Sequence, residues 1–580
     1  MTPTNQSKTC DMKNNFPRSK KSFQELKIAV IVSERIFQYL IFDADIFILT
    51  KDNFKYVIEH VNIDFILIES SIHFSVKDWD YCLFEFSSSS ILLTDLLKSA
   101  KKSQIPVVFW KTTHSLYPNG LIHICKYFDR IYSSFLKDEI CSMPAKYLPC
   151  AIQPKLFHPF SILKEKKYKN EHVLIEHSLS LIKNRKLQDF INSCDLPFKF
   201  IETSVSKQNS IQGTNTHIQF CSKSQRKKII SESISAVSFE IAPGYTQHSI
   251  WDDLEVMAMG VPLLFFGKLD QSDIRKDIVN CETTDFNELG LELYRLNDTQ
   301  YRNKVSQKCF RFIHSRHTIS HRLNIICDDL KISKKWIEYP LVTVCFATHR
   351  KEYLFNCIEN FNKQNYNNKE LIISYNGSDK ICDNILEHFP AKCRDITRII
   401  QTPKESALGA ALNCAVNSSR GDYFLKMDDD DYYSENYITD MIIAVRSFEI
   451  DIFGKPQNNF FHFEGDNYLY KRLNRRGDRY FICMNDPSIR ESQIVIGNSI
   501  SGRTEFFKMN PFPENMYRHT DTAFFKRITS GRLNGYIAVC DYFNMIVERK
   551  RDTNFHTWMI SEEELKGKCK SNYFSMDAIV

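Results

Sequence analysis

The sequence predicts an α/β protein built from several parallel-sheet units. Short apolar runs that suit buried strands alternate with helix-like segments along most of the 580 residues. That alternation is typical of βαβ units, in which helices connect parallel strands. One run, Tyr423 to Met427, ends abruptly in four consecutive aspartates, Asp428 to Asp431. Because open α/β sheets bind ligands beyond the carboxyl ends of their strands, the acidic run marks a candidate site.

The composition is that of an ordinary globular chain with room for roughly three to four domain-sized units. A formal net charge of +6 is small for this length and predicts no nucleic-acid partner, while it permits weak attraction to phosphates or anionic lipid. The 18 cysteines lack CxxC pairs and zinc-type spacing, which predicts reduced core thiols in a cytoplasmic protein. No secretory signal or membrane-spanning stretch is evident, so any membrane contact is expected to be peripheral, at the inner face.

The N-terminal half is expected to form two lobes after a disordered tail at residues 1–25. The Pro-punctuated segment 145–159 predicts the crossover between these lobes, and a nucleotide crevice is expected between them. A helix at 249–260 and mostly helical chain at 287–330 belong to the second lobe. The predicted strands are 26–33, 63–70, 105–112 and 128–134 in the first lobe and 172–178, 233–242 and 261–267 in the second.

The C-terminal half predicts one further unit after a linker at 332–340. Its expected strands are 341–349, 370–378, 396–402 and 423–427, and its expected helices end near 364 and cover about 408–417. Residues after about 559 predict a loosely held tail. We therefore expect domains at 26–335 and 336–560 and a C-terminal tail at 561–580.

The acidic run itself allows several interpretations. Four adjacent carboxylates repel one another, so folding them beside a buried strand calls for a compensating cation. Hard oxygen ligands suit Mg²⁺ or Mn²⁺, which keep positions for water and substrate phosphates. The alternatives are a solvated acidic turn that caps the next helix, a structural cation site, and a metal-dependent nucleotidyl or phosphoryl transferase.

The surrounding residues, Leu341 to Trp558, resemble the family 2 glycosyltransferases of the GT-A fold. The segment VTVCFATHRKEYLFNCIENFNKQNYNNKELIISYNGS resembles the family's nucleoside-binding opening, and ALGAALNCAVNSSRGDYFLKMDDDDYY resembles the approach to its DXD acidic motif. The resemblance implies sugar transfer from a nucleotide-diphosphate donor, with Thr348, Arg350 and Asn376 at the nucleotide. The family often carries acidic residues where this chain has Tyr375 and Asn376, which leaves the nucleotide open. It frequently has an Arg at the position of Leu412.

The resemblance also implies a metal site and a base. Asp430 corresponds to the direct ligand of Mn²⁺ or Mg²⁺, and Asp428 to a contact with the ribose or the metal-bound water. His556 corresponds to a third ligand in some members, with a structural histidine as the alternative. Asp521, in MYRHTDTAFFKR, fills the Asp position of the later acidic motif, where Thr520 replaces the usual Glu. Asp521 is thus the expected general base of an inverting transfer, with an N-cap as the alternative.

The N-terminal half resembles another class, the CgeB-like GT-B transferases associated with spore maturation. KYLPCAIQPKLFHP, DLEVMAMGVPLLFF and RHTISHR resemble its interlobe, nucleotide-sugar and C-terminal motifs. The resemblance implies that Glu255 binds the donor ribose; Arg185 could face the diphosphate, although a solvated surface position is the alternative that we favour. Asp252 stands where the class usually has an Arg, and a carboxylate there would repel a diphosphate.

The predicted fold is therefore a GT-B-like pair of Rossmann-like lobes followed by a GT-A nucleotide-diphospho-sugar transferase domain. The predicted function is transfer of a sugar to a glycan or lipid-linked glycan acceptor in bacterial surface polysaccharide or glycoconjugate biosynthesis. The alternative is a single GT-A enzyme whose N-terminal half is a non-catalytic docking or acceptor-binding module.

Overall fold

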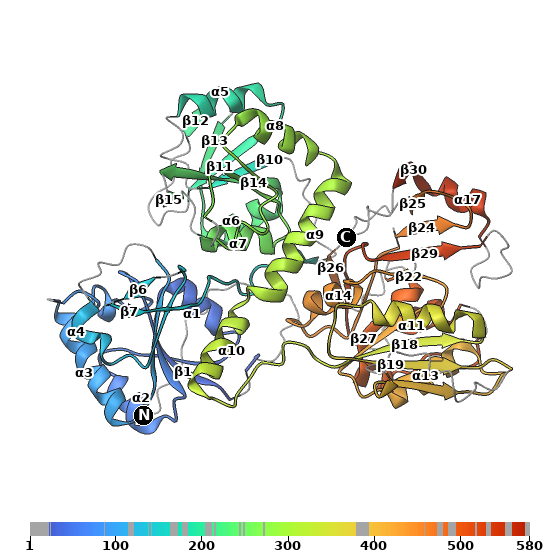
Figure 1. Cartoon of the computed structure of the whole chain (residues 1–580), viewed down its shortest axis with the longest axis horizontal. Coiled ribbons are helices and arrows are strands. Elements are labelled where there is room, and N and C mark those ends of the chain that lie inside the picture. The colour runs from blue at the N-terminus through green and yellow to red at the C-terminus, as the bar shows by residue number, and fades with distance from the viewer. Residues whose placement is uncertain are drawn as a thin grey trace. The chain divides into compact units, whose positions relative to one another are not determined.

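The computed structural model of the chain (Figure 1) forms two compact units. Among the residues that the structure describes, those up to Pro159 and those from His172 to Glu338 form the N-terminal unit, and those from Tyr339 onward form the C-terminal unit together with Phe160, Ser161 and Ile162. The structure describes residues 22–23, 25–85, 87–113, 121–136, 138–140, 142–162, 172–176, 184–202, 211–213, 216–242, 245–246, 250–270, 273–378, 394–457, 459–472, 480–484, 495–516, 519–528, 530, 535–550 and 560–574. Most of the predicted N-terminal tail lies outside these residues, but Phe23 is 1% exposed and belongs to the hydrophobic core.

The first lobe of the N-terminal unit is a six-stranded parallel sheet in the order β2-β1-β3-β4-β5-β8. Its strands are β1 (Lys27–Ile31), β2 (Asp45–Ile48), β3 (Phe65–Glu69), β4 (Val107–Lys111), β5 (Arg130–Ser133) and β8 (Lys146–Tyr147). Its helices are α1 (Glu34–Leu40), α2 (Phe54–His60), α3 (Ser88–Lys102) and α4 (Ile122–Cys125), and β6 (Glu139–Ile140) pairs with β7 (Met143–Pro144). The four strands that the apolar runs predict are all present, whereas β2 and β8 are additional.

The second lobe has parallel strands in the order β13-β11-β10-β14-β16-β17, which corresponds to the 3-2-1-4-5-6 order of doubly wound nucleotide-binding sheets. These strands are β10 (His172–Glu176), β11 (Phe198–Glu202), β13 (Thr216–Phe220), β14 (Ser233–Ala242), β16 (Leu263–Phe266) and β17 (Cys281–Thr283). Antiparallel edges are added by β12 (Ile211–Gly213) and β15 (Tyr245–Thr246). The helices are α5 (Arg185–Ser193), α6 (Lys223–Ser231), α7 (Ile250–Ala258), α8 (Phe286–Arg295) and α9 (Thr299–Arg316). The next helix, α10 (Ile319–Leu330), returns to the first lobe, where Asp329 accepts a hydrogen bond of 2.6 Å from the Tyr132 hydroxyl of β5.

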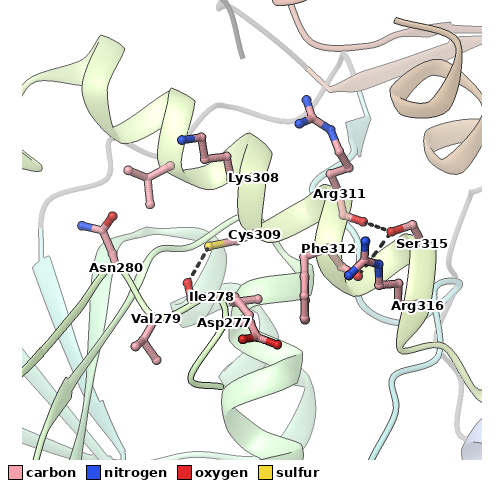
Figure 2. A pocket seen from close by; sticks show the side chains of 11 residues that line it. Asp277, Ile278, Val279, Asn280, Lys308, Cys309, Arg311, Phe312, Ser315 and Arg316 are labelled. Carbon is pink, nitrogen blue, oxygen red and sulfur yellow. Dashed lines mark hydrogen bonds between the residues drawn. The ribbon is translucent and has the colours of Figure 1, made fainter. Parts of the chain in front are cut away.

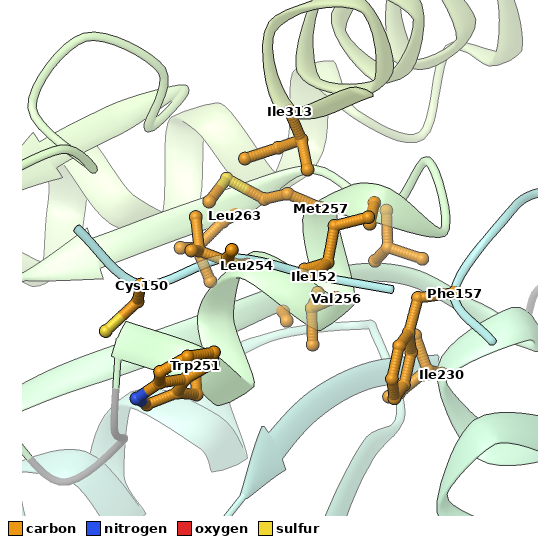
Figure 3. Close-up of a cluster of buried hydrophobic side chains, with 14 of the residues drawn as sticks. Cys150, Ile152, Phe157, Ile230, Trp251, Leu254, Val256, Met257, Leu263 and Ile313 are labelled. Atoms are coloured by element: carbon orange, nitrogen blue, oxygen red, sulfur yellow. The ribbon is translucent and has the colours of Figure 1, made fainter. Parts of the chain in front are cut away.

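The crossover segment and the RHTISHR segment meet inside the N-terminal unit. Ile152 bridges to Thr318, and the buried Arg322 guanidinium donates to the carbonyl oxygens of Pro149 and Cys150 at 2.7 and 2.8 Å. Figure 3 shows the crossover beside α7, with Cys150, Ile152 and Phe157 in one apolar cluster with Trp251, Leu254 and Met257. In this structure the RHTISHR segment therefore holds the crossover segment in place.

The C-terminal unit is built on a nine-stranded sheet in the order β20-β19-β18-β21-β27-β23-β28-β26-β9. Its strands are β18 (Val342–Thr348), β19 (Lys369–Tyr375), β20 (Thr397–Gln401), β21 (Tyr423–Met427), β23 (Ile452–Gly454), β26 (Phe481–Met484), β27 (Ser501–Arg503), β28 (Tyr536–Val539) and β9 (Ser161–Ile162). The first four strands in this list are parallel to one another, as predicted. β27 pairs antiparallel with β21, so the sheet as a whole is mixed. The helical segments are η4 (Lys351–Tyr353), α11 (Leu354–Asn362), α13 (Leu408–Ser418), α14 (Tyr437–Val445), η7 (Gly497–Ser499), α15 (Thr504–Met509) and α16 (Thr520–Arg527).

This unit contains a second, five-stranded sheet, and the C-terminal segment that was predicted to be a tail belongs to it. Its order is β22-β29-β24-β25-β30. The strands are β22 (Tyr432–Tyr433), β24 (Phe460–Phe463), β25 (Leu469–Arg472), β29 (Met545–Arg549) and β30 (Cys569–Phe574), with α17 (Glu562–Gly567) preceding the last strand. Most of the expected tail is thus ordered, because β30 pairs antiparallel with β25 and Leu565 of α17 is buried.

Two further expectations concern cysteines and membranes. Cys345 and Cys540 are buried free thiols, as the sequence predicts. Cys125 departs from that expectation because it is disulfide-bonded. In the part of the chain that the structure describes, no helix is both long and apolar enough to cross a bilayer.

Candidate active site

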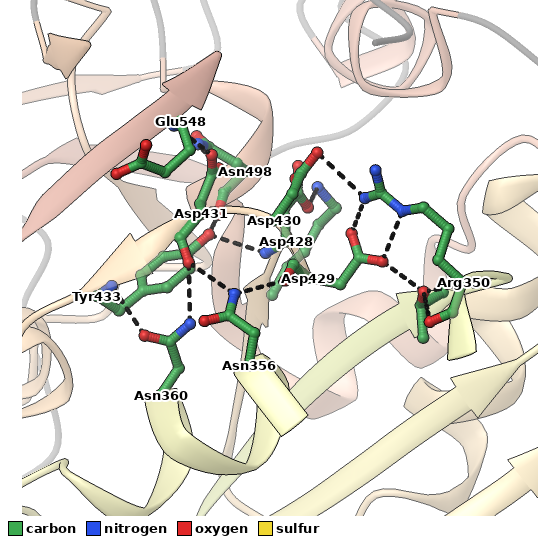
Figure 4. Close-up of polar contacts among 12 residues, drawn as sticks. Arg350, Asn356, Asn360, Asp428, Asp429, Asp430, Asp431, Tyr433, Asn498 and Glu548 are labelled. Carbon is green, nitrogen blue, oxygen red and sulfur yellow. Dashed lines mark hydrogen bonds and ion pairs between the residues drawn. The ribbon is translucent and has the colours of Figure 1, made fainter. Parts of the chain in front are cut away.

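The acidic run follows the carboxyl end of β21, which lies beside β18 in the sheet. Here the strand order changes direction, since β19 and β20 lie on one side of β18 and β21 on the other. Doubly wound sheets bind ligands at such a switch point. Figure 4 shows that Arg350, at the end of β18, and Asn356 and Asn360, from α11, converge on this run.

Asp429 is held by two residues that the sequence places at the donor nucleotide. The Arg350 guanidinium contacts both carboxylate oxygens of Asp429, with Nε at 3.0 Å from Oδ2, and Thr348 Oγ1 also donates to Oδ2. Arg350 Nη2 lies 3.1 Å from Asp430 Oδ2. The two residues therefore neutralise and orient the acidic run in this structure, and a direct nucleotide contact stays a prediction for both.

Asp428 and Asp430 are the two aspartates of the run with side chains that reach the surface, at 38% and 20% exposed. Asp428 Oδ1 accepts a hydrogen bond of 2.5 Å from the Lys426 ammonium. Burial, and then the neighbouring Asp428 charge, raise the pKa of Asp430 above its ordinary value, while Arg350 opposes the shift.

The donor set fits Mg²⁺ or Mn²⁺ that is completed by substrate oxygens. Two nearby carboxylates are typical protein ligands for these ions, which take further oxygens from phosphates and water. Among the described residues, no group of three or more His, Cys, Asp and Glu side chains is arranged to hold a metal. His556, the predicted third ligand, lies outside the described residues.

Asp431 is a structural member of the run. It is 4% exposed, and its carboxylate accepts hydrogen bonds from Asn498 Nδ2 and from the backbone N–H of Glu548. Its carbonyl oxygen accepts from Asn356 and Asn360. Burial, followed by the charges of the neighbouring aspartates, raises its pKa. We infer that Asp431 fixes the turn after the run.

Asp521 occupies the first turn of α16, and its carboxylate is poorly satisfied. Its Oδ1 is buried and has no hydrogen-bond partner among the described residues. Burial raises its pKa, the Lys426 ammonium lowers it, and Asp428 raises it. The N-cap of α16 is His519, in the left-handed region at φ 61°, so Asp521 does not occupy the capping position.

The remaining residues that the sequence singles out in this unit have clear places. Asn376 follows β19, and its Nδ2 donates to the carbonyl of Ser406 at 2.8 Å. Tyr375 is buried, and Leu412 packs in the core on α13. Neither of these two side chains is available to a nucleotide, whereas Asn376 is partly exposed at the carboxyl end of its strand.

The sequence reasoning missed a histidine–glutamate pair and a lysine at this site. His462 Nδ1 lies 2.7 Å from Glu548 Oε2, although 86 positions separate the residues in the chain. Burial raises the pKa of Glu548, His462 lowers it, and Asp430 raises it, so the pair lies near the acidic run. Lys426, inside an apolar strand, was visible in the sequence as a charge at a buried position.

In the N-terminal unit, Glu255 is part of a buried charge network. Its Oε2 contacts the Arg226 guanidinium, and its Oε1 accepts from the Tyr39 hydroxyl of α1. Arg226 also forms a two-bond pair with Glu176, at 2.6 and 2.8 Å. Glu255 is 3% exposed, and both of its oxygens already have partners.

Asp252 is neutralised by residues that the sequence did not indicate. Its Oδ1 lies 2.6 Å from Arg35 Nη2 and 3.6 Å from Arg226 Nη2. The expected repulsion at Asp252 is therefore offset by two arginines. Arg185 is exposed at the start of α5 and is not among the described members of this network.

A separate pocket of about 360 Å³ lies between α9 and the segment before β17 (Figure 2). Lys308, Arg311 and Arg316 supply positive charge to its lining, and Asp277 supplies one negative charge. The Arg316 guanidinium lies 5.4 Å from the Phe312 ring. Neither Glu255 nor Arg185, the predicted donor residues of this unit, lines the pocket.

The C-terminal fold and site define an α/β transferase domain whose acidic run lies at a nucleotide-type switch point. Residues 342–512 match the family described as "Glycosyl transferase family 2". The C-terminal unit thus contains a family 2 glycosyltransferase domain. The match lies wholly within this unit.

The similar curated proteins are named as glycosyltransferases. The chain is 27% identical over 139 residues to glycosyltransferase GlyA of Streptococcus pneumoniae serotype 4, covering 22% of this chain and 20% of GlyA. It is 26% identical over 119 residues to glycosyltransferase GlyG of the same organism, covering 20% and 39%. The chain therefore spans less than half the length of these curated relatives. Among solved structures, S. aureus TarS 1–349 with UDP-GlcNAc is 16% identical, with a TM-score of 0.29 over 36% of this chain and 58% of that chain.

Proposed function

We propose that the C-terminal unit transfers a sugar from a nucleotide-diphosphate donor to a glycan or lipid-linked glycan acceptor. The observation that carries the proposal is the buried Oδ1 of Asp521, which has no hydrogen-bond partner among the described residues and lies near the Lys426 ammonium that also contacts Asp428. A carboxylate with a raised pKa beside an acidic run that could hold a phosphate-bound cation suits proton removal from an acceptor hydroxyl. The match to family 2 supports the same reaction class.

Asp428 and Asp430 would hold a divalent Mn²⁺ or Mg²⁺ ion together with the donor diphosphate. When bound, such an ion neutralises the diphosphate and makes it a better leaving group. Arg350 pairs with Asp429 and Asp430 and so reduces the charge repulsion between the carboxylates of the run. Thr348, Arg350 and Asn376 stand at the carboxyl ends of β18 and β19, where the nucleoside would lie.

Asp521 would accept the proton of the acceptor hydroxyl, and attack from the face opposite the leaving group would invert the anomeric centre. An unpaired buried carboxylate binds a proton more tightly than one in water, which suits a base. Surface polysaccharide or glycoconjugate assembly, with a peripheral contact at the inner membrane face, is the setting that we propose for this reaction.

The test is consumption of nucleotide sugars by the full-length protein. Asp521→Asn is expected to slow turnover by roughly 10²–10⁴-fold while donor binding persists. Asp430→Asn, or prior treatment with EDTA, is expected to abolish turnover in folded protein. Turnover and donor affinity are measured across a panel of UDP- and GDP-sugars, with circular dichroism as the check of folding. Near-normal turnover of Asp430→Asn would contradict the proposal.

For the N-terminal unit, the buried network favours the non-catalytic module over a second transferase. A ribose at Glu255 would have to displace Arg226 or Tyr39, and removing one partner of a buried ion pair costs about 3–5 kcal/mol. We therefore propose that this GT-B-like unit docks the acceptor or a partner.

Full-length protein with Asp430→Asn separates the two alternatives. A docking unit is expected to leave every nucleotide sugar of the panel intact. Donor consumption by this variant that Glu255→Gln abolishes would instead establish a second active site, with Glu255 in the predicted ribose-binding role.

A further inference from the structure

Lys426 is a buried lysine on β21, two residues before the acidic run. Its side chain is 2% exposed, and its ammonium donates to Asp428 Oδ1 at 2.5 Å and to the carbonyl of Gly497 at 2.9 Å. Burying an ammonium is costly unless its charge and its N–H groups find partners. A cation at this point of an otherwise apolar strand therefore needs a reason beyond packing.

Gly497 connects Lys426 to the base. A Cβ atom at this position would lie 2.1 Å from Asp521 Oδ2, so the backbone of η7 packs directly against the Asp521 carboxylate. Lys426 holds the carbonyl of this same residue. Burial lowers the pKa of Lys426, but Asp428 and then Asp521 raise it, which places both carboxylates near its ammonium.

Asn498, the next residue of η7, is connected by hydrogen bonds to both ends of the acidic run. The Asn498 carbonyl accepts from the Tyr433 hydroxyl at 2.9 Å, and that hydroxyl accepts from the backbone N–H of Asp428 at 2.8 Å. The Asn498 amide donates to Asp431. The segment that abuts the base is thus fastened to the acidic run through two successive residues, with Lys426 supplying the charged contact.

We propose that Lys426 is a positioning residue that sets Asp521 relative to Asp428, because one ammonium holds Asp428 and the Gly497 carbonyl together. The inference rests on the proposed transferase function. Catalysis is sensitive to such placement, since a displacement of about 1 Å can reduce a rate about 10²-fold. Lys426 acts through Asp521 and Asp428 and is assigned no contact with the substrate.

The experiment is a double-mutant cycle in the full-length protein with Mn²⁺ and UDP-glucose, UDP-GlcNAc and GDP-mannose as probes. Lys426→Met is expected to lower turnover by about 10²-fold. In the Asp521→Asn background, the same change is expected to lower it by less than about 3-fold, because residues that act through one another are not additive. Lys426→Arg, which keeps the charge, is expected to recover at least about 10-fold of the loss.

Lys455 provides the matched control. It is another fully buried lysine of the C-terminal unit, paired with Asp541 at 2.9 Å. Lys455→Met is expected to lower the unfolding temperature and to leave turnover per folded molecule unchanged. Equal losses of turnover in Lys426→Met and Lys455→Met at matched folded fractions would overturn the positioning role.

Other outcomes are equally decisive. Wild-type turnover in Lys426→Met, or the same fold-loss with and without Asp521→Asn, overturns the inference while the proposed function stands. If Asp521→Asn and Asp430→Asn both retain turnover, the proposed function fails and the positioning role falls with it. If Lys426→Met does not fold, Gly497→Ala replaces it: the added methyl must displace the Asp521 carboxylate. The loss of turnover that Gly497→Ala causes must then vanish in the Asp521→Asn background. An undiminished loss of turnover in that background overturns the inference.

Discussion

The four aspartates after β21 are identical in the sequence and have four different environments. Asp428 is bound by a buried lysine, Asp429 by an arginine and a threonine, and Asp431 by amide groups. Asp430 is partly exposed beside the same arginine. The resemblance to the acidic motif of family 2 led to Asp428 and Asp430 as the expected metal-binding pair. Their partners could not be predicted, because they come from segments as distant as residues 348 and 548.

Asp431→Ala is expected to cost stability. The substitution leaves the buried Asn498 amide and the Glu548 backbone N–H without their acceptor, at about 1–3 kcal/mol for each unsatisfied donor. Part of this cost is offset, because burial already disfavours the ionised carboxylate of Asp431. We expect a loss of about 1–3 kcal/mol in the free energy of unfolding, measured by urea denaturation at pH 7.

The neighbouring Asp430→Asn is the control for this prediction. Its side chain is 20% exposed, and we expect its free energy of unfolding to stay within about 0.5 kcal/mol of the wild type. If both variants lose the same stability, the two aspartates do not differ as described.

At the scale of elements, the apolar runs predicted the four parallel strands of the C-terminal sheet and missed its other strands. Strands such as β18 and β21 are five to seven residues long and mostly apolar, so each stands out in the sequence as an apolar run. The other half of the sheet is made of short strands such as β23 and β27, with three residues each. Short segments carry little periodic signal, and their pairing is decided by distant partners. β30 has six residues but was mistaken for a tail, because its sequence, CKSNYF, contains no apolar run.

The contact between β24 and β29 is expected to depend on pH. Burial lowers the pKa of His462, but the hydrogen bonds to Glu548 and to the Asp466 carbonyl, together with the charges of these two residues, outweigh it, so that the net shift is upward. A histidine whose pKa is raised by folding stabilises the folded state fully below its unfolded pKa of about 6.5, and this contribution is lost as the pH rises through the folded value.

Both side chains are about one-third exposed, at 30% and 36%, so we expect at most about 1 kcal/mol from the pair. The measurement is the free energy of unfolding between pH 5.5 and about 8.5 for the wild type and His462→Gln. The difference between the two proteins should shrink as the pH rises. A difference that grows toward alkaline pH would contradict the assignment.

At the scale of the whole molecule, the strand β9 is a feature that the sequence did not predict. Two residues, Ser161–Ile162, pair parallel with β26 of the C-terminal unit, although they lie in the N-terminal half of the chain. A segment this short has no detectable period. By contrast, the change of unit at Glu338–Tyr339 lies within the linker predicted at 332–340.

Phe160→Ala is expected to destabilise the C-terminal unit. The Phe160 side chain is 6% exposed and packs edge-on against Phe448 and Tyr480, at ring distances of 5.9 and 5.2 Å. Removing a buried phenylalanine costs about 3–5 kcal/mol. Hydrogen exchange should show faster exchange in β26 and β28.

Phe157→Ala is the matched control, three residues earlier. Phe157 is 7% exposed and belongs to the core of the N-terminal unit. Its truncation should speed exchange in that unit and spare β26. The same exchange pattern in both variants would show that β9 is not a part of the C-terminal sheet.

The place of β9 also constrains how this chain can have been assembled in evolution. In the part of the chain that the structure describes, the polypeptide passes from the N-terminal unit to the C-terminal unit at Pro159–Phe160 and again at Glu338–Tyr339. Joining two complete genes end to end gives a single junction and leaves each product whole. Here the transferase domain keeps one of its edge strands inside the coding region of its neighbour. A recombinant that imports residues 339–580 alone would therefore bring a sheet without β9, its last strand, and would leave the edge of β26 unpaired.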